Sequence, residues 1–257
     1  MEPSAITCPS FIAALDPALC RAVDLYCERT SASLLAEPLN ALSNLAFFIA
    51  AWFAWRAFGR IAPARGDRLV ILLIVMMPVI GLGSFAFHVL AVGWAAWADV
   101  IPILVFMLLY LWLALRRYCR WPAWLSAVGL ALFFLATFNI ELLVPSRILR
   151  GGAMYLPALV TLAAMALAPV SREVRRALAG AAGVFLLSYA LRTLDHPICS
   201  SLPVGTHFLW HCLNALLLYL LARAALLHGA VAPPLASLAP SSGLRPPSPN
   251  RKSDREK

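Results

Sequence analysis

The chain has 257 residues, of which 62% are hydrophobic and only 13% are charged. Soluble domains usually carry about 25% charged residues, so this composition excludes an ordinary soluble fold. The net charge of +9 comes mainly from arginines that separate the apolar blocks. It therefore indicates membrane topology, and no nucleic-acid partner is needed to explain it.

Residues 1–37 form a polar segment before the first apolar block. No basic stretch precedes an apolar core here, so this segment is not expected to be a signal peptide. It contains several acidic residues and three of the six cysteines. We expect it to be an extracytoplasmic N-terminal segment that lies outside the membrane-spanning domain.

Seven apolar blocks follow, and each is about as long as a helix that crosses a hydrocarbon core of roughly 30 Å. They cover residues 38–58, 69–91, 98–115, 122–144, 152–171, 176–193 and 204–227. The sequence therefore predicts an all-α polytopic membrane protein, with a bundle of seven transmembrane helices over residues 38–228.

Residues 229–257 are rich in Pro and Ser and end in mixed charge, which is typical of a disordered tail. Arginines gather at the first, third and fifth connections and after the last block, and they are scarcer at the alternate connections. By the positive-inside rule, the N-terminus lies outside and the tail lies in the cytoplasm.

Five polar side chains interrupt the apolar blocks at one predicted depth. Ser84 and His88 are spaced i, i+4 near the outer end of the second block, and Asp99 begins the third. His207 and His211 have the same spacing at the outer end of the seventh block. Because i, i+4 residues share a helix face, three separate elements can bring these groups together on the outer side.

Three histidines beside an acid are what a catalytic zinc site requires. Zn²⁺ takes three protein ligands and keeps one position for water, and His88, His207 and His211 could be those ligands. Asp99 is the only acidic residue of the second and third blocks, so it is the candidate base. Ser84 could donate a hydrogen bond to a developing oxyanion.

Other interpretations of these residues compete with a zinc site. A single histidine in an apolar block is more often a packing residue, and Ser84 alone could be a helix contact. Haem would need axial ligands from opposed faces, whereas an i, i+4 pair points to one side. Three histidines at one depth with an acid nearby favour the metal.

Four stretches carry a resemblance to a known family. They are CERTSASLLAEPLNALSNLAF (27–47), GLGSFAFHVL (81–90), WADVIPILVFMLLYL (97–111) and GTHFLWHCLNA (205–215). The chain resembles the alkaline ceramidase family, within a seven-span hydrolase superfamily that includes the adiponectin and progestin receptors, over most of residues 23–228. The resemblance implies that His88, His207 and His211 bind zinc. It also implies that Ser84 and Asp99 are the catalytic serine and aspartate.

The resemblance further implies a calcium site just before the first block. Glu28 and Glu37 match the family's ligands, with Asp24 and the main-chain carbonyl of Tyr26 as further candidates, and calcium prefers several oxygens. The segment departs from the family's pattern, because Asp24 lies one residue further from the cysteine and Thr30 replaces an asparagine. The loop before Glu37 is also shorter. The alternative is that these acids only mark a solvated segment.

The cysteines agree with the predicted topology. Cys8, Cys20, Cys27 and Cys199 fall in outer segments, where disulfides persist. Four cysteines allow three pairings. The resemblance suggests a bond between Cys27 and Cys199, which leaves Cys8 with Cys20 as the second pair.

The function implied by the resemblance is that of a ceramidase, a hydrolase acting on carbon–nitrogen bonds of linear amides. It would cleave the N-acyl amide of ceramide, or of a ceramide-like lipid, to a fatty acid and a sphingoid base. A membrane lipid is the expected substrate, and no protein partner is evident. The compact, Arg-rich, Lys-poor sequence suggests the inner membrane of a bacterium, with the site toward the periplasm. Because many bacteria lack ceramide, another N-acylated lipid is an alternative substrate.

Two other functional classes remain as alternatives. One is a receptor-like lipid sensor with a structural zinc, against which the tail shows no obvious docking segment. The other is a proton or ion transporter with Asp99 as a relay. A transporter should carry polar residues toward both faces, whereas here they gather near one face. The distribution favours an enzyme.

Overall fold

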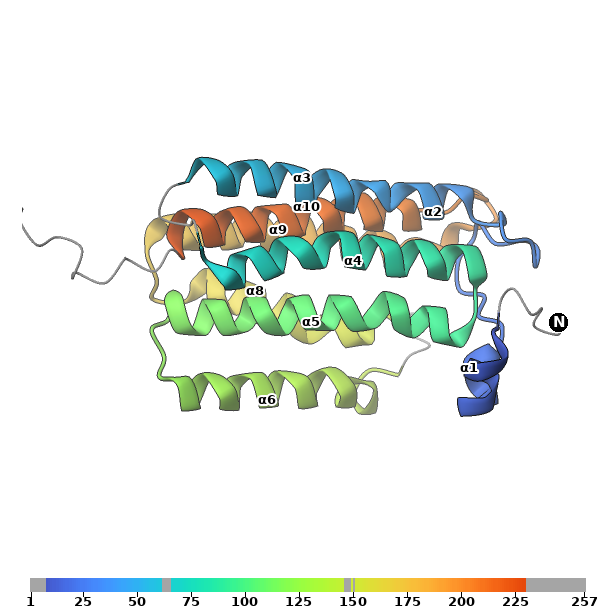
Figure 1. Ribbon diagram of the computed structural model, residues 1–257, viewed down its shortest axis with the longest axis horizontal. Coiled ribbons are helices and arrows are strands. Elements are labelled where there is room, and N and C mark those ends of the chain that lie inside the picture. Colours follow the sequence, from blue (N-terminus) through green and yellow to red (C-terminus); the bar gives the residue numbers. More distant parts are fainter. Residues whose placement is uncertain (1–7, 62–65, 146–148, 150, 230–257) are drawn as a thin grey trace, which may run out of the picture.

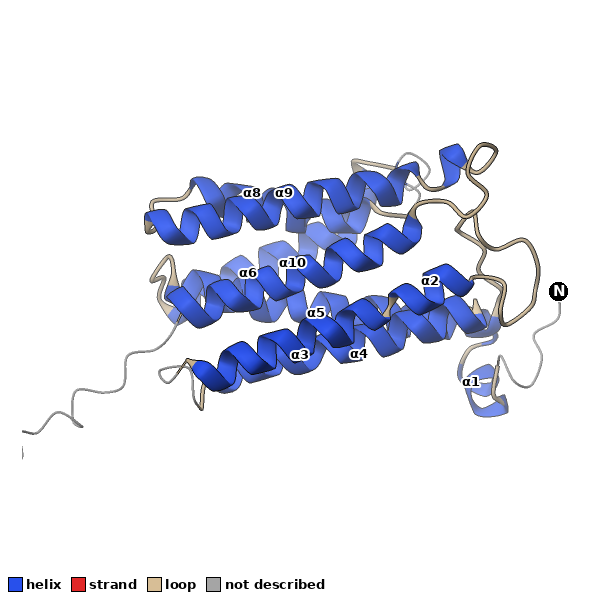
Figure 2. Ribbon diagram, turned by 90° about the horizontal axis from the view of Figure 1, so that it is seen from above, coloured by secondary structure: helices blue, strands red, loops and turns tan. Residues whose placement is uncertain are grey.

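The protein is described here by a computed structural model, which covers residues 8–61, 66–145, 149 and 151–229. The predicted tail, residues 230–257, lies outside the described residues. Within them, all regular structure is helical apart from one isolated β-bridge, which confirms the all-α prediction (Figure 2). Figure 1 shows the long helices side by side with nearly parallel axes.

Helices account for most of the described chain. The helices of the bundle are α2 Pro38–Ser43, α3 Leu45–Arg60, α4 Arg68–Leu90, α5 Gly93–Arg117, α6 Ala123–Asn139, α8 Leu156–Leu167, α9 Arg172–Leu194 and α10 His207–His228. The short helices outside it or between its members are α1 Ser10–Leu15, η1 Pro17–Cys20, η3 Ile140–Leu142, η4 Ala153–Tyr155 and η5 His196–Ile198.

Six helices in the described residues are long and apolar enough to cross a membrane. They cover 38–60, 68–90, 93–117, 123–142, 172–194 and 207–228. The chain is therefore an integral membrane protein. The predicted fifth span is shorter, because α8 has only 12 residues and rises about 18 Å, less than a hydrocarbon core of roughly 30 Å. Pro169 follows its extended C-cap Ala168, and the predicted count of seven spans is not confirmed.

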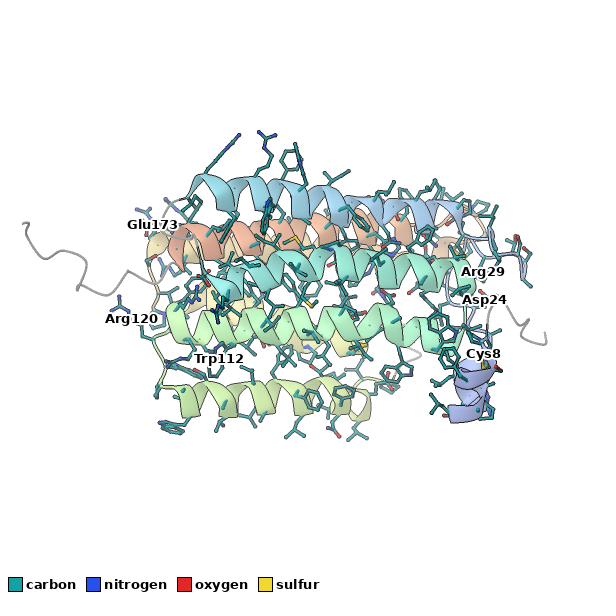
Figure 3. The ribbon with its side chains drawn as sticks, in the orientation of Figure 1. Cys8, Asp24, Arg29, Trp112, Arg120 and Glu173 are labelled. Atoms are coloured by element: carbon teal, nitrogen blue, oxygen red, sulfur yellow. A yellow bond between two sulfur atoms is a disulfide. The ribbon has the colours of Figure 1, made fainter. Side chains whose placement is uncertain are left out.

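The two ends of the bundle differ in what they carry. We call one the segment end, because residues 8–37 and the connections before α5 and α10 lie there. The other is the arginine end, at which α3, α5 and α10 finish. In Figure 3, Cys8, Asp24 and Arg29 lie at the segment end, whereas Arg120 and Glu173 lie at the arginine end.

The N-terminal segment is attached to the bundle at several points. Its Cys27 lies at disulfide distance from Cys199, in the connection before α10, with 5.2 Å between their Cα atoms. Cys8 and Cys20 form the second pair at disulfide distance. Main-chain hydrogen bonds join residues 21–23 to the turn at 91–93, which connects α4 to α5. The segment is therefore held against the ends of α4, α5 and α10.

Candidate functional site

The three predicted histidines come together at the segment end. His88 lies in the last turn of α4, while His207 and His211 lie in the first two turns of α10. All three are buried, and one nitrogen of each lies within 4.8 Å of the others. The His88 and His211 Nε2 atoms are 3.1 Å apart. Two helices far apart in the sequence thus place three imidazoles around one point.

The hydrogen bonds of these rings fit a metal site. The His88 Nδ1 lies 2.6 Å from Glu37 Oε2, and the His211 Nδ1 lies 2.7 Å from the Ser43 hydroxyl. Each contact leaves the Nε2 atom of that ring facing the centre of the cluster. The His207 Nδ1 is buried without a hydrogen-bond partner among the described residues. Three imidazoles, two of them oriented by outer partners, are the donor set of a catalytic zinc site.

Glu37 is the buried carboxylate that orients His88. Its Oε2 also accepts a hydrogen bond from the Asn40 side chain at 3.0 Å, and its Oε1 pairs with Arg29 Nε at 2.5 Å. Burial alone would raise the pKa of Glu37. The hydrogen bonds from His88, Asn40 and Arg29 outweigh burial and hold its pKa below the ordinary value. Glu37 is therefore an anion that favours a proton on the His88 Nδ1 and a free Nε2.

The start of α10 is fixed by Asp195, which is 2% exposed. Its Oδ1 accepts hydrogen bonds from the main-chain N–H groups of Thr206 (2.6 Å) and His207 (2.8 Å), and its Oδ2 accepts one from Cys27 (3.0 Å). A carboxylate at a helix N-terminus is stabilised by the helix dipole. Asp195 thus joins the N-terminal segment to the helix that carries two of the histidines.

A glycine makes this arrangement possible. Gly205 has a φ of +64° and lies directly against the Asp195 carboxylate, so a side chain there would displace it. Neither residue was among the predicted site residues. The available signal was a single acid at the end of the sixth apolar block, followed by a glycine directly before the Thr-His pair.

Tyr26 covers the cluster from outside. Its ring stacks on His207 with 3.6 Å between centroids and 18° between planes. Burial raises the pKa of Tyr26 to about 12, so its hydroxyl stays protonated. The sequence had suggested only its main-chain carbonyl, as a calcium ligand. The structure gives its side chain a different role, as a lid on one histidine.

Ser84 and Asp99 lie beside the histidines. The Ser84 hydroxyl is 3.4 Å from the His211 Nε2 and is close enough to the Asp99 carboxylate to hydrogen-bond with it. The close approach of α4 and α5 depends on Gly83, because a Cβ there would overlap the Ala98 carbonyl. Main-chain contact between the two helices thus sets the spacing between Ser84 and Asp99.

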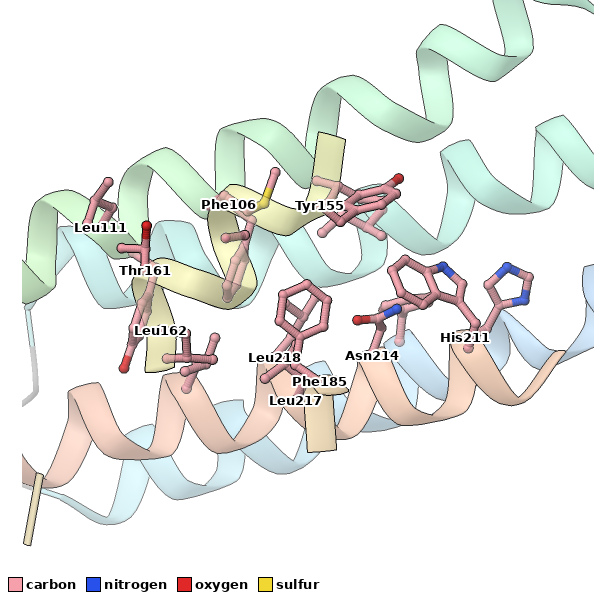
Figure 4. Close-up of a pocket in the computed structure, with 18 of the residues that line it drawn as sticks. Phe106, Leu111, Tyr155, Thr161, Leu162, Phe185, His211, Asn214, Leu217 and Leu218 are labelled. Carbon is pink, nitrogen blue, oxygen red and sulfur yellow. The ribbon is translucent and has the colours of Figure 1, made fainter. Parts of the chain in front are cut away.

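An apolar cavity opens from these polar groups into the bundle. Ser84, Asp99 and His211 line its head. The rest of the lining is largely aliphatic and aromatic and includes Phe106, Leu111, Tyr155, Leu162, Phe185, Asn214, Leu217 and Leu218 (Figure 4). Asp99 and Leu111 are 12 residues apart along helix α5, which corresponds to a rise of about 18 Å. The cavity is therefore deep and is polar mainly at one end.

Arg192 adds a buried positive charge next to the cavity. Its guanidinium lies over the rings of Tyr155 (5.6 Å) and Trp210 (5.7 Å), two residues of the cavity wall. Its charge acts on Asp99, which lies at the head of the same cavity. The sequence analysis used the arginines together as topology markers, because nothing in a single sequence says that one of them, Arg192, faces inward.

The predicted calcium ligands have other partners. The two oxygens of Glu28 accept hydrogen bonds from the main-chain N–H groups of Leu39 (2.7 Å) and Asn40 (2.8 Å), at the start of α2. Glu37 belongs to the histidine cluster, and Asp24 is exposed. Among the described residues, the only group of three or more His, Cys, Asp or Glu at ligand distance is the histidine triad. The carboxylates of Glu28 and Glu37 therefore contact different partners, and the calcium site stays a prediction.

Three supporting polar residues of the first span were not predicted. Asn40 and Asn44 are buried, and Ser43 holds His211. Together with Glu37 they form a polar stripe at helical spacing in an otherwise apolar stretch. That spacing was the signal available in the sequence, and it marks the face of α2 that contacts α4 and α10.

Comparison with known proteins agrees with this geometry. The ceramidase family matches residues 23–228 of the chain. A search of curated proteins finds no match. The matched region includes the three histidines, Ser84 and Asp99. The chain therefore belongs to the ceramidase family, which makes it a hydrolase of the amide bond of ceramide.

Proposed function

We propose that this ceramidase-family member is a zinc-dependent intramembrane amidase. It hydrolyses the N-acyl amide bond of ceramide, or of a ceramide-like lipid, to a fatty acid and a sphingoid base or amine. The observation that carries the proposal is the buried triad of His88, His207 and His211 at the head of an apolar cavity. A centre that can activate water thus lies next to a cavity that can bind an alkyl chain.

The triad would hold the zinc, with Glu37 and Ser43 orienting two of its rings. When bound there, zinc supplies Lewis acidity, which lowers the pKa of a water and polarises the amide carbonyl. Tyr26 and the N-terminal segment keep bulk water from the outer side of the cluster. All three rings are buried, so the metal they would hold lies away from bulk solvent.

Asp99 is the proposed general base and acid. Its carboxylate takes one proton as water attacks the amide carbon. It then gives that proton to the nitrogen as the carbon–nitrogen bond breaks, so the amine leaves neutral and the carboxylate is restored. Ser84, between Asp99 and His211, is placed to donate a hydrogen bond to the carbonyl oxygen as negative charge develops on it.

The apolar cavity is proposed to hold an alkyl chain of the lipid. Its walls offer dispersion contacts and no competing charge below Asp99, so a chain can enter without leaving polar groups unpaired. A transporter would need polar groups along a path to both ends, and the cavity lacks them below its head apart from a few uncharged groups such as Asn214 and Thr161. The polar head and apolar body favour an amidase.

The arginine end is proposed to face the cytoplasm. The described arginines in the last turns of α3 and α5, in the connection after α5 and in the first turns of α4 and α9 gather there, as the positive-inside rule requires of short cytoplasmic loops. The metal cluster and both cysteine pairs then face the opposite, oxidising side, which in a bacterium is the periplasm. Substrate would reach the cavity from the outer leaflet.

The test is a double substitution of two histidines, His207→Ala with His211→Ala, in detergent-purified protein. We expect the parent to contain one zinc per chain and to release fatty acid from a ceramide in mixed micelles. The double variant should lose both properties. His196→Ala is the matched control, because His196 is exposed and lies outside the cluster. Unchanged zinc in the double variant would contradict the ligand assignment, and a parent with zinc but no amide hydrolysis would contradict the activity.

A further inference from the structure

A positive side chain contacts Glu37, one of the residues that the resemblance implies as calcium ligands. The Arg29 side chain is 7% exposed, and its Nε donates to Glu37 Oε1 at 2.5 Å. Its Nη2 donates to the main-chain carbonyl of His88 at 2.8 Å. Its Nη1 reaches the carbonyls of Ser31 (3.3 Å) and Ser33 (3.4 Å). One carboxylate and three carbonyls thus surround a single cation.

This set of oxygens is the kind that calcium prefers, yet here a guanidinium fills it. Calcium binds carboxylate and carbonyl oxygens in a flexible shell, while guanidinium satisfies the same atoms through N–H donors in a fixed plane. A calcium ion at Glu37 would have to displace Arg29, because two cations at one buried carboxylate repel each other. Glu28 is held elsewhere, since both of its oxygens accept main-chain hydrogen bonds at the start of α2.

Arg29 acts on the metal cluster from two directions. Through Glu37 it contacts the carboxylate that holds the His88 Nδ1, and through its Nη2 it holds the main chain of the same histidine. His88 is therefore fixed both at its ring and at its backbone. Arg29 also supplies the opposite charge beside the Glu37 carboxylate, which is 3% exposed, and a buried carboxylate without such a partner would be costly.

We propose that the Arg29 guanidinium is a built-in replacement for calcium, a positioning residue that fixes Glu37 and His88 so that this enzyme needs no calcium. The proposal rests on the proposed zinc site for its effect on catalysis. The claim that no calcium is needed depends only on the contacts of Arg29. Because the positive charge is part of the protein itself, the arrangement of the cluster does not depend on the calcium concentration around the membrane.

The first measurement is the melting temperature of the parent in chelator and in millimolar calcium. A ligand that binds only the folded state raises the melting temperature, so we expect no shift in the parent. A calcium-dependent shift in the parent would overturn the proposal. This measurement needs neither zinc nor substrate, so its failure is distinguishable from a failure of the proposed activity.

The second measurement uses Arg29→Ala, which removes the cation and leaves its oxygens. We expect zinc affinity to fall about 10–100-fold, the usual effect of losing an outer partner of a metal ligand, together with a lower kcat. Added calcium should then raise the melting temperature of this variant and restore part of its zinc affinity. Arg21→Ala, which removes an exposed arginine from the same segment, should match the parent.

A conservative variant keeps the proposal testable if Arg29→Ala does not fold. Arg29→Lys retains one positive charge but loses the planar set of donors. It should bind zinc more tightly than Arg29→Ala where both fold, show a reduced kcat with little change in KM, and ignore calcium. The positioning role would be overturned if both variants matched the parent in zinc affinity and kcat. If Arg29→Ala fails to fold, the same result in Arg29→Lys alone would overturn it.

Discussion

The two ends of the bundle handle charge in opposite ways. At the arginine end most basic side chains face outward, and an ion pair between Asp67 and Arg117, with contacts of 2.5 and 3.0 Å, joins the start of α4 to the end of α5. At the segment end, Glu37, His88 and Asp195 are each no more than 3% exposed. Exposed charge can set orientation at little cost, whereas buried charge requires partners on every side.

This contrast predicts where substitutions should affect chemistry. At the segment end each buried polar group contacts residues from distant parts of the chain, so its loss should change turnover or metal binding. At the arginine end the same kind of change should alter only stability.

The sharpest test at the segment end is Asp99→Asn. The variant keeps the shape of the side chain but cannot accept a proton from water. We expect kcat to fall about 10²–10⁴-fold, as is usual on loss of a general base, with zinc content unchanged. The measurement is fatty-acid release together with metal analysis. Glu141→Gln removes an exposed carboxylate near the same end and should be neutral; an Asp99 variant equally neutral would make Asp99 structural.

A second test separates positioning from metal binding. Gly83→Ala places a methyl group against the Ala98 carbonyl, which must push α5 away from α4 and shift Asp99 from Ser84. We expect kcat to fall about 10²-fold, since displacement by 1 Å can cost that much. Zinc should be retained, because α5 carries none of the three histidines. Gly180→Ala is the control, since its added methyl meets no atom within 4 Å. Loss of zinc in Gly83→Ala with kcat preserved would contradict our assignment, in which the contact between α4 and α5 positions Asp99 and does not affect metal binding.

The smallest effect is expected at the arginine end. Burial tends to raise the pKa of Asp67, but the hydrogen bond and charge of Arg117 hold it below the ordinary value of 3.8. The pair therefore stabilises the fold at neutral pH, and this contribution is lost as the pH falls through the lowered pKa. Asp67→Asn should cost about 0.5–1 kcal/mol at pH 7 and nothing in kcat. Thermal melting at pH 7 and in acid checks this; a large fall in kcat would break the comparison between the ends.

Much of the fold followed from pattern alone. Blocks of apolar residues of membrane-spanning length identify six of the helices, because the hydrocarbon core imposes a minimum length on any span. The shorter α8 was taken as a full span, since the apolar run 152–171 does not reveal that an extended residue and Pro169 end the helix early. The histidine cluster was within reach, because i, i+4 spacing and one shared depth bring His88, His207 and His211 together.

The surroundings of the cluster were harder to predict. Glu37 carries a charge typical of a calcium ligand, and only the fold shows that its oxygens face His88 and Arg29. Asp195 and Tyr26 act through a main-chain cap and a ring stack, and neither contact leaves a periodic pattern in the sequence. Such partners come from tertiary packing between distant segments, which a single sequence does not encode locally.

The link between Cys27 and Cys199 has a consequence for how the enzyme is made. The two cysteines are 172 residues apart, and two of the three histidines lie beyond the second one. A nascent chain that has inserted its first spans therefore holds His88 and Glu37 but cannot complete the cluster. The two parts of the cluster meet only when α10 enters the bilayer. Oxidation of Cys27 and Cys199 then holds them together. If the cluster is the proposed hydrolytic centre, the membrane in which the protein is assembled is thus spared hydrolysis until α10 is in place.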